Sequence, residues 1–164
     1  MSTTPRRWPN EVENEREGAM RFADEATHIL QRAQTTLDGA RAKVGANQNL
    51  ALVLITDTER YLSDALARTE RVRRFIAVAK GKPINGRWPQ VATRQRDEAE
   101  EYLERAINSL DEAEASIRPL RDKIAKNPAL CEAIIADLAL LLSRAITRIE
   151  RVVRLLTEGG LGRA

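Results

Sequence analysis

Apolar residues recur every three or four positions along four stretches of this chain. The stretches run from Ala19 to Val44, from Ile55 to Ile76, from Ala99 to Ile124 and from Ile135 to Leu156. This spacing puts apolar side chains on one face of an α-helix, and its length is typical of helices that pack together at a shallow angle. The pattern predicts four long helices, near residues 9–44, 48–79, 89–125 and 128–158.

Residues that start and stop helices lie between these stretches. Pro9 and Pro89 stand where a first helical turn can begin, because the N–H that proline lacks is not needed there. Asn47 and Asn127 occupy positions that suit a helix N-cap. Residues 80–89 read KGKPINGRWP, and this density of glycine and proline predicts a loop. Short connections make consecutive helices antiparallel, which predicts an up-down-up-down order.

The sequence also repeats itself. When the chain is shifted by 80 positions without a gap, 22 of the 69 residues from 7 to 75 are identical to those from 87 to 155. The tripeptide Arg-Trp-Pro at residues 7–9, for example, recurs at residues 87–89. A repeat of this length must be recognised before a fold is assigned, because it defines the structural unit.

The repeat leads to a specific architecture. We expect an all-α fold, an up-down-up-down four-helix bundle built from a tandem duplication of a helical hairpin of ~80 residues. The repeats, near residues 7–80 and 87–160, would form a single helical domain over 1–164. A lengthwise twofold axis would then place equivalent parts of the two halves at the same end of the molecule.

Both halves carry a residue that weakens a helix at the same place. Gly39 lies inside the first predicted helix, and Pro119 occupies the matching position in the third. Proline removes a backbone hydrogen bond and clashes with the preceding turn. We expect a bend at both positions, clearest at Pro119, as a consequence of packing. A hinge or a ligand slot is the alternative.

Composition limits the class of protein. Of the 164 residues, 43% are hydrophobic and 31% are charged, as in globular chains, and the net charge is only +3. Cys131 is the only cysteine, so no internal disulfide can form, and no apolar run reaches the ~20 residues that a membrane helix needs. The first ten residues lack the apolar core of a signal peptide. We expect a soluble, cytoplasmic protein with no membrane partner.

Arginines recur three residues apart near the end of the second predicted helix and again in the fourth. In an up-down-up-down bundle both sets would lie at one end, beside two tryptophans and two further arginines. Guanidinium groups next to aromatic rings are typical of sites that bind phosphate or nucleic acid. The candidate anion-binding or nucleic-acid-binding residues are Arg68, Arg71, Arg74, Arg148, Arg151, Arg154, Trp8, Trp88, Arg7 and Arg87.

An internal network of ion pairs is the simpler explanation for several of these arginines. Folding each hairpin about its turn brings acidic residues of the preceding helix level with the arginines. These acidic residues are Asp24 and Glu17 in the first half and Glu104 and Asp97 in the second. A glutamate also stands four residues before the last arginine of each set, a favourable helical spacing. These pairs are Glu70–Arg74 and Glu150–Arg154.

Two arginines and the two tryptophans require separate interpretations. Arg68 and Arg148 fall in a stripe that is otherwise apolar, so we expect each to be partly buried beside a carboxylate or a ligand. Trp8 and Trp88 precede predicted helices, where an apolar residue commonly packs back against the first turns. We interpret them first as such staples, with a stacking platform as the alternative.

The other end of the predicted bundle is rich in apolar residues. The second helix is apolar at six consecutive positions from Leu50 to Ile55, and its counterpart begins at Leu130. A helix that is apolar all round must be covered on more than one side. We expect a homodimer or larger assembly, with a thick internal core as the alternative. The candidate oligomer-interface residues are Leu52, Val53, Ala133, Leu140 and Leu141.

No group of residues indicates catalysis. His28 is the only histidine and its counterpart is Asn108, so we place it on a solvated helix face. Cys131 aligns with Ala51 and is predicted to be a small packed residue. The sequence lacks the two Glu-x-x-His motifs on facing helices that a di-metal bundle needs, and it has no glycine-rich phosphate loop and no zinc-ligand spacing. We expect no catalytic residue, no metal ligand and no cofactor.

The carboxylates of the chain suggest one further kind of site, a binding site for magnesium. All-α nucleotide hydrolases hold magnesium with clustered carboxylates, and acidic residues of the third and fourth helices could be assigned that role. The residues concerned are Glu98, Glu100, Glu101, Glu104, Glu132 and Asp137. Because Glu132 and Asp137 are five residues apart, they point to different faces of a helix. This geometry disfavours the assignment.

Three hypotheses about function follow. The leading one is a non-catalytic helical-bundle protein that acts through protein–protein contacts, as an assembly subunit or accessory factor. The alternative is a nucleic-acid-binding or nucleoprotein accessory bundle that uses the arginine-rich end. The remote alternative is the all-α, metal-dependent nucleotide hydrolase. No small-molecule substrate is indicated.

Overall fold

A computed structural model describes residues 7–161 of the chain. A short 3-10 helix, η1 (Asn10–Val12), precedes α1 (Glu13–Lys43), α2 (Gln48–Gly81), α3 (Gln90–Ile117), α4 (Leu120–Lys123) and α5 (Pro128–Gly159). The described residues form no strand, and their one β-bridge joins Arg7 to Gly160. The predicted all-α class is confirmed. Within 7–161, no helix is both long and apolar enough to span a bilayer.

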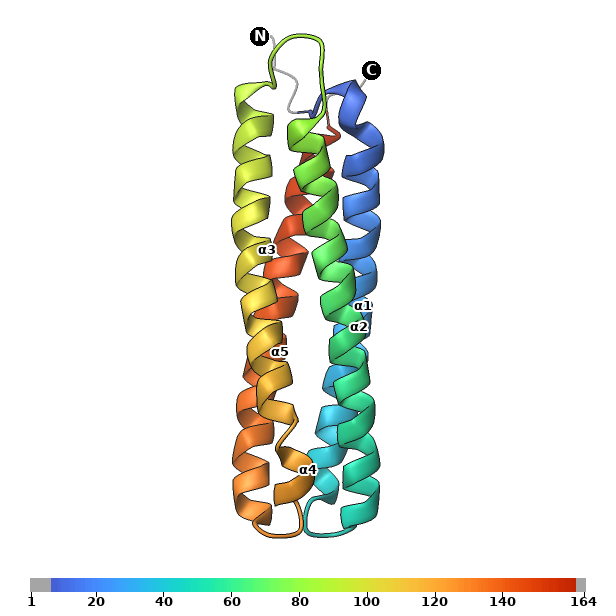
Figure 1. The fold of residues 1–164 in the computed structure, drawn as a ribbon, viewed down its shortest axis with the longest axis vertical. Helices are drawn as coiled ribbons and strands as arrows, with labels where there is room; N and C mark the ends of the chain where they lie inside the picture. The colour runs from blue at the N-terminus through green and yellow to red at the C-terminus, as the bar shows by residue number, and fades with distance from the viewer. Residues whose placement is uncertain (1–6, 162–164) are drawn as a thin grey trace.

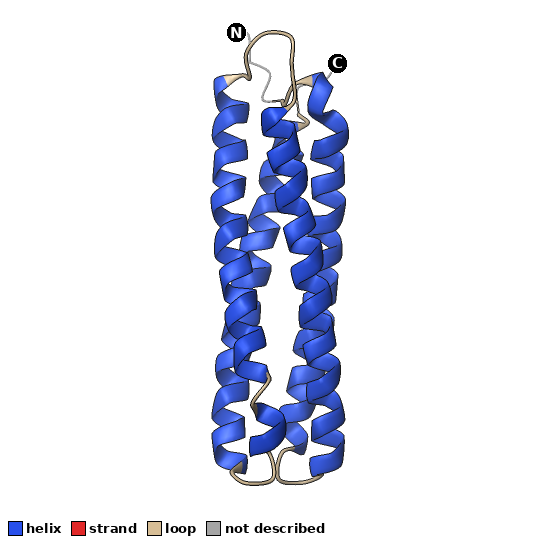
Figure 2. Cartoon of the chain, viewed as in Figure 1, coloured by secondary structure: helices blue, strands red, loops and turns tan. Residues whose placement is uncertain are grey.

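The four long helices run lengthwise beside one another (Figure 1). Helix α1 packs against α2 and α5, and α3 packs against the same two helices. The turns after α1 and α4 lie at one end of the molecule, and the 82–89 loop lies at the other (Figure 2). The starts of α1 and α3 and the ends of α2 and α5 meet at this second end. We call it the tryptophan end because it holds Trp8 and Trp88.

The core follows the three- and four-residue spacing read from the sequence. In α2 every buried residue belongs to one such series, in which two threonines take the place of apolar residues. The series is Ala51, Ile55, Thr58, Leu62, Ala65, Thr69, Val72, Ile76 and Ala79. The corresponding face of α1 consists mainly of alanine, and small side chains at a contact let helix axes approach closely.

The turns at the end opposite to the tryptophans form as predicted. The side chains of Asn47 and Asn127 each accept a hydrogen bond, of 3.1 Å, from the backbone N–H of Leu50 and Leu130 respectively. Each asparagine thereby satisfies one of the free N–H groups of the first helical turn. Gly45 adopts a φ of 87° in the first of these turns, a conformation that favours glycine.

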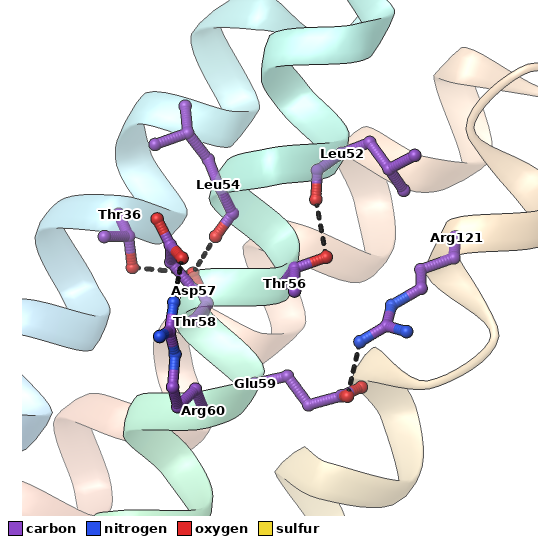
Figure 3. Close-up of polar contacts among 9 residues, drawn as sticks. All are labelled: Thr36, Leu52, Leu54, Thr56, Asp57, Thr58, Glu59, Arg60 and Arg121. Atoms are coloured by element: carbon purple, nitrogen blue, oxygen red, sulfur yellow. Dashed lines mark hydrogen bonds and ion pairs between the residues drawn. The ribbon is translucent and has the colours of Figure 1, made fainter.

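The predicted irregularity at Pro119 is a complete interruption of the third helix. Helix α3 ends at Ile117, and the chain re-enters a helix at Leu120 to form α4. Arg121 of α4 then reaches Glu59 of α2 across 2.6 Å, as Figure 3 shows. In the same view, Thr36 of α1 and Thr58 of α2 share a 2.6 Å hydrogen bond between their hydroxyl groups.

Gly39 differs from its counterpart Pro119 because α1 passes through it without interruption. A β-carbon at this glycine would lie 3.2 Å from the Cδ1 atom of Leu54, so the bare backbone accommodates a leucine of the neighbouring helix. The interruption therefore occurs in the second half of the chain only. Helices predicted at 9–44 and 89–125 are accordingly a 3-10 turn followed by α1, and α3 followed by α4.

Removing either asparagine cap should destabilise the protein. Asn47→Ala and Asn127→Ala should each lower the free energy of unfolding by about 1 kcal/mol, because a helical N–H loses its acceptor. Chemical denaturation followed by circular dichroism measures this effect. Asn49→Ala changes an exposed asparagine two residues away and should leave the midpoint nearly unchanged. Equal effects at residues 47 and 49 would contradict the capping role.

Candidate binding surface

The tryptophan end is closed by direct contact between the two tryptophans. Trp8 is 0% exposed, and its ring centroid lies 5.1 Å from that of Trp88. The backbone N–H of Trp8 donates to the carbonyl oxygen of Gly159 at 2.7 Å. A β-carbon at Gly159 would come within 2.5 Å of the indole ring of Trp8, so this end requires a glycine.

The burial of Trp8 corrects one assignment made from the sequence. Trp8 was a candidate for contact with an anion or nucleic acid, but a fully buried ring offers no face to a ligand. Its ring lies against Gly159 at the end of α5 and against Trp88. Trp88 is half-buried, and the guanidinium of Arg96 lies over its ring at 4.7 Å from the centroid.

Two buried arginines at this end were not identified from the sequence. Arg16 donates to the carbonyl oxygen of Leu156 at 2.7 Å and pairs with Glu13. A cation at this position also lies at the negative end of the α5 dipole. Arg96 pairs with Asp97 at 3.1 Å. The 80-residue shift places Arg16 on Arg96, so the repeat contained a signal for this pair.

The predicted arginines at residues 7 and 87 line one hollow on the tryptophan end. The hollow has a volume of about 320 Å³ and is shared with Trp8, Pro9, Pro89, Asn10, Asn85 and Glu11. The backbone N–H of Asn85 donates to the carboxylate of Glu11, which lowers the pKa of that carboxyl. Two guanidinium groups and one firmly ionised carboxylate therefore share this hollow.

The two sets of helix arginines do not form a single cluster. Helices α2 and α5 each pack against α1 and α3, so α1 and α3 separate them. The set on α2 (Arg68, Arg71, Arg74) and the set on α5 (Arg148, Arg151, Arg154) lie in corresponding parts of the chain but on different sides of the molecule. Helices α2 and α5 both end at the tryptophan end, where the two sets were predicted to lie, so the sets share that end without adjoining one another.

Two of the three arginines of α5, Arg148 and Arg151, have hydrogen-bond partners within the protein. Arg151 pairs with Glu98 of α3 at 3.1 Å, and this hydrogen bond raises the pKa of the guanidinium. Arg148 donates to the hydroxyl of Ser109 at 2.7 Å and to the backbone oxygen of Arg105 at 3.1 Å. We expected Arg148 to lie beside a carboxylate or a ligand, but both of these acceptors are neutral.

Arg154 lines a different hollow, between α1 and α5, of about 530 Å³. Asp24, His28 and Glu150 also line it. His28 is exposed and its Nδ1 atom lies 2.8 Å from the backbone oxygen of Asp24. Carboxylates and a guanidinium group therefore line this hollow together. Its charge does not favour the binding of an anion.

The arginines of α2 are less completely paired. Arg68 lies 3.3 Å from Glu25, one residue from the acidic position predicted. The guanidinium of Arg71 lies over the ring of Phe22, at 5.1 Å from its centroid. Arg71 and Arg74 have no carboxylate within ion-pair distance among residues 7–161. The predicted Glu70–Arg74 and Glu150–Arg154 pairs do not form within the described part of the chain.

Phe75 is the centre of this part of the molecule. Its ring stacks on Phe22, with centroids 5.8 Å apart, and covers the backbone of Gly18, where a β-carbon would lie 2.8 Å from the ring. One hollow, of about 300 Å³, lies between Phe75 and Asn14, Glu15, Arg71, Arg74 and Val78. Another, of about 430 Å³, lies between Phe75 and Asn14, Glu17, Gly18 and Arg21.

We call this region the arginine–phenylalanine surface and define it by five residues of α1 and α2. They are Arg21, Phe22, Arg71, Arg74 and Phe75. It combines guanidinium groups without a bound carboxylate, aromatic rings and an adjoining exposed apolar residue, Val78, which is 55% exposed. The sequence identified Arg71 and Arg74 as candidate binding residues, but it did not identify Arg21, Phe22 or Phe75 as such.

The candidate oligomer-interface residues separate into two groups. Val53 and Leu140 are 55% and 57% exposed, and Ala133 is exposed as well. Leu52 and Leu141 are half-buried, and Leu141 packs against the core. Much of the apolar surplus of α2 and α5 is therefore taken up inside the molecule.

Within 7–161, no three His, Cys, Asp or Glu side chains converge in a way that could hold a metal ion. Cys131 is buried, and burial raises the pKa of its thiol, which suits a packing role. No protein-family model, curated protein or solved structure matches the chain.

Adding a methyl group at Gly159 should disrupt the tryptophan end. Gly159→Ala should cost about 1–3 kcal/mol of unfolding free energy, because the indole of Trp8 must move to admit the β-carbon. Denaturation monitored by tryptophan fluorescence measures this. Gly81→Ala is the matched control, since nothing lies within 4 Å of a β-carbon there. A neutral Gly159→Ala would contradict the packing described.

The contribution of Glu11 to stability should depend on pH. Its folded-state pKa lies below the ordinary value because the N–H of Asn85 donates to the ionised carboxylate. The stabilisation is therefore present at neutral pH and is lost as the pH falls through that lowered pKa. Glu11→Gln should destabilise the protein at pH 7, and its deficit should vanish under strongly acidic conditions. A deficit independent of pH would argue against this role.

Proposed function

We propose that this chain is a non-catalytic, up-down-up-down four-helix bundle that acts through protein–protein contacts, as an assembly subunit or accessory factor. The bundle arose by tandem duplication of a hairpin of ~80 residues, and the protein works in the cytoplasm. Support for the architecture comes from the 22 identities between the halves and from the packing of α1 and α3 against both α2 and α5.

The observation that carries the proposal is the arginine–phenylalanine surface. Protein interfaces are enriched in aromatic side chains and arginine, and a few such residues provide most of the binding energy. Phe75 lies between two hollows, with Arg71 and Arg74 lining one and Arg21 lining the other. Val78 extends the apolar part of this surface into solvent.

The same surface is a weaker match to nucleic acid. Glu15 and Glu17 line the two hollows beside Phe75 and would repel phosphate groups. The arginines of α2 and α5 lie on different sides of the molecule, so they provide no continuous basic track for a phosphate backbone. The hollow between Arg7 and Arg87 is the observation that supports the nucleic-acid alternative.

Replacing apolar side chains of this surface with carboxylates should abolish partner binding. The double variant Phe75→Asp with Val78→Asp should lose a partner that the wild-type protein retains in a quantitative affinity capture from its native cells, performed in parallel with and without nuclease. Val78 is exposed and Phe75 is half-buried against Phe22 and Gly18, so circular dichroism and thermal unfolding must show that the double variant keeps its fold. Thr157→Asp with Leu161→Asp provides an exposed control away from the surface.

Two outcomes would contradict the proposal. One is a set of captured proteins that is identical for the wild type and for the Phe75→Asp, Val78→Asp variant. The other is a partner that disappears whenever nuclease is added, which would show that nucleic acid bridges it and would favour the alternative function.

A further inference from the structure

The two halves of the chain differ sharply at the positions around Phe75. The 80-residue shift aligns the arginine–phenylalanine surface with a region of α3 and α5 that keeps both α5 arginines but has other neighbours. The changes from the first half to the second are Gly18 to Glu98, Arg21 to Glu101, Phe75 to Leu155 and Val78 to Glu158. The first half therefore combines three arginines with two carboxylates that line the hollows, Glu15 and Glu17, whose counterparts are Gln95 and Asp97. The second half has gained three carboxylates.

These differences change which groups the arginines contact. In the second half, Glu98 holds Arg151 at 3.1 Å. In the first half, glycine replaces that glutamate, and the ring of Phe75 lies where its side chain would begin. Arg71 consequently lies on Phe22 and has no carboxylate among the described residues. One substitution thus removes a competing carboxylate and makes room for an aromatic ring.

A buried acceptor lies beside the same hollow. Glu15 lines it, and its carboxylate is largely buried, with only 12% of the side chain exposed. One oxygen, Oε1, accepts from Lys82 at 2.7 Å, and the other, Oε2, has no hydrogen-bond partner among the described residues. Buried polar atoms are usually satisfied, so Oε2 is an exception at the wall of this hollow. The hollow offers positive charge, apolar surface and one acceptor.

We propose that the partner of the arginine–phenylalanine surface is an acidic amphipathic helix of another protein, bound along the groove between α1 and α2 in the first half only. This inference rests on the proposed function. Carboxylates of the partner pair with Arg71, Arg74 and Arg21, and its apolar side chains enter the hollows on both sides of Phe75. Residues three and four apart on a helix supply both kinds of group on one face.

A helix suits this groove better than the other common forms of peptide. The described residues present no sheet edge to which a strand could add, and two long antiparallel helices leave a groove into which the ridges of a third helix can pack. Charge complementarity selects an acidic helix, because guanidinium groups bind carboxylates with two parallel hydrogen bonds. Because Glu15 and Glu17 line the same hollows, a partner that combines carboxylates with apolar side chains fits better than a uniformly charged polyanion.

The test uses three fluorescent probes with the full-length chain. The first is a 21-residue helical peptide with leucine along one face and glutamate beside it. The second has lysine in place of every glutamate, and the third is an oligothymidylate of matched length. Fluorescence anisotropy should show saturable 1:1 binding of the acidic peptide, weakened by added salt, and no binding of the basic peptide. Oligothymidylate should bind more weakly than the acidic peptide.

The repeat supplies a matched pair of variants. Arg71→Glu with Arg74→Glu should weaken binding of the acidic peptide by about thirtyfold or more, as expected for central interface residues. Arg151→Glu with Arg154→Glu makes the same charge change at the equivalent positions of the second half, and it should alter the affinity less than about threefold. Circular dichroism and thermal unfolding confirm that both proteins fold.

A gain-of-function variant tests the explanation for the asymmetry. Transferring the first-half residues to the second half, as Glu98→Gly, Glu101→Arg, Leu155→Phe and Glu158→Val, should create a second site. The binding stoichiometry should rise from one acidic peptide per chain to two. If this variant does not fold, Gly18→Glu in the first half tests the same point, since it should abolish the single site.

Three results would overturn the inference. They are no binding of the acidic peptide, equal loss of binding in the two arginine variants, and tighter binding of oligothymidylate through Arg71 and Arg74. If the acidic peptide fails while the Phe75→Asp, Val78→Asp variant still loses its cellular partner, the proposed function stands and only the chemistry of the partner is wrong. If both fail, the proposed function fails as well.

Discussion

Three glycines leave stretches of helix backbone bare, and the rest of the structure depends on what lies against them. Gly159 receives the indole of Trp8, Gly39 receives Leu54, and Gly18 receives Phe75. In each case a β-carbon would lie 2.5 to 3.2 Å from the neighbouring side chain. Protein interiors pack without spare volume, so a methyl group at such a contact forces the neighbour to move. The closed tryptophan end and the aromatic centre of the binding surface are both consequences of this constraint.

The contact at Gly18 also decides the electrostatics of the first half. An exposed ion pair contributes little to the stability of the fold. A guanidinium group in such a pair is nevertheless no longer free to bind a carboxylate of a partner. Glu98 does this to Arg151, whereas Gly18 leaves Arg71 on the ring of Phe22. Two related halves therefore present different surfaces, although their cores share the same helical spacing.

The sequence predicted those features that local chemistry determines. Helix spacing, the asparagine caps and the 82–89 loop depend on neighbours a few residues away, and all of them form as expected. Features that depend on side-chain positions across helices were less predictable. The acidic partner of Arg68 is displaced by one residue, and the burial of Arg16 was missed because charged side chains are rarely buried. Gly18 gave no signal, since its role appears only when Phe75 lies over it.

The most direct test of this account is the pH dependence of the arginine side-chain ¹⁵Nε resonances. Arg151 is held by a carboxylate, so its resonance should shift as the carboxyl groups are protonated between neutral and acidic pH. Arg71 lies on an aromatic ring without a carboxylate, so its resonance should be nearly constant over the same range while the protein stays folded. A shift of Arg71 as large as that of Arg151 would show that a carboxylate already occupies it and would contradict the account.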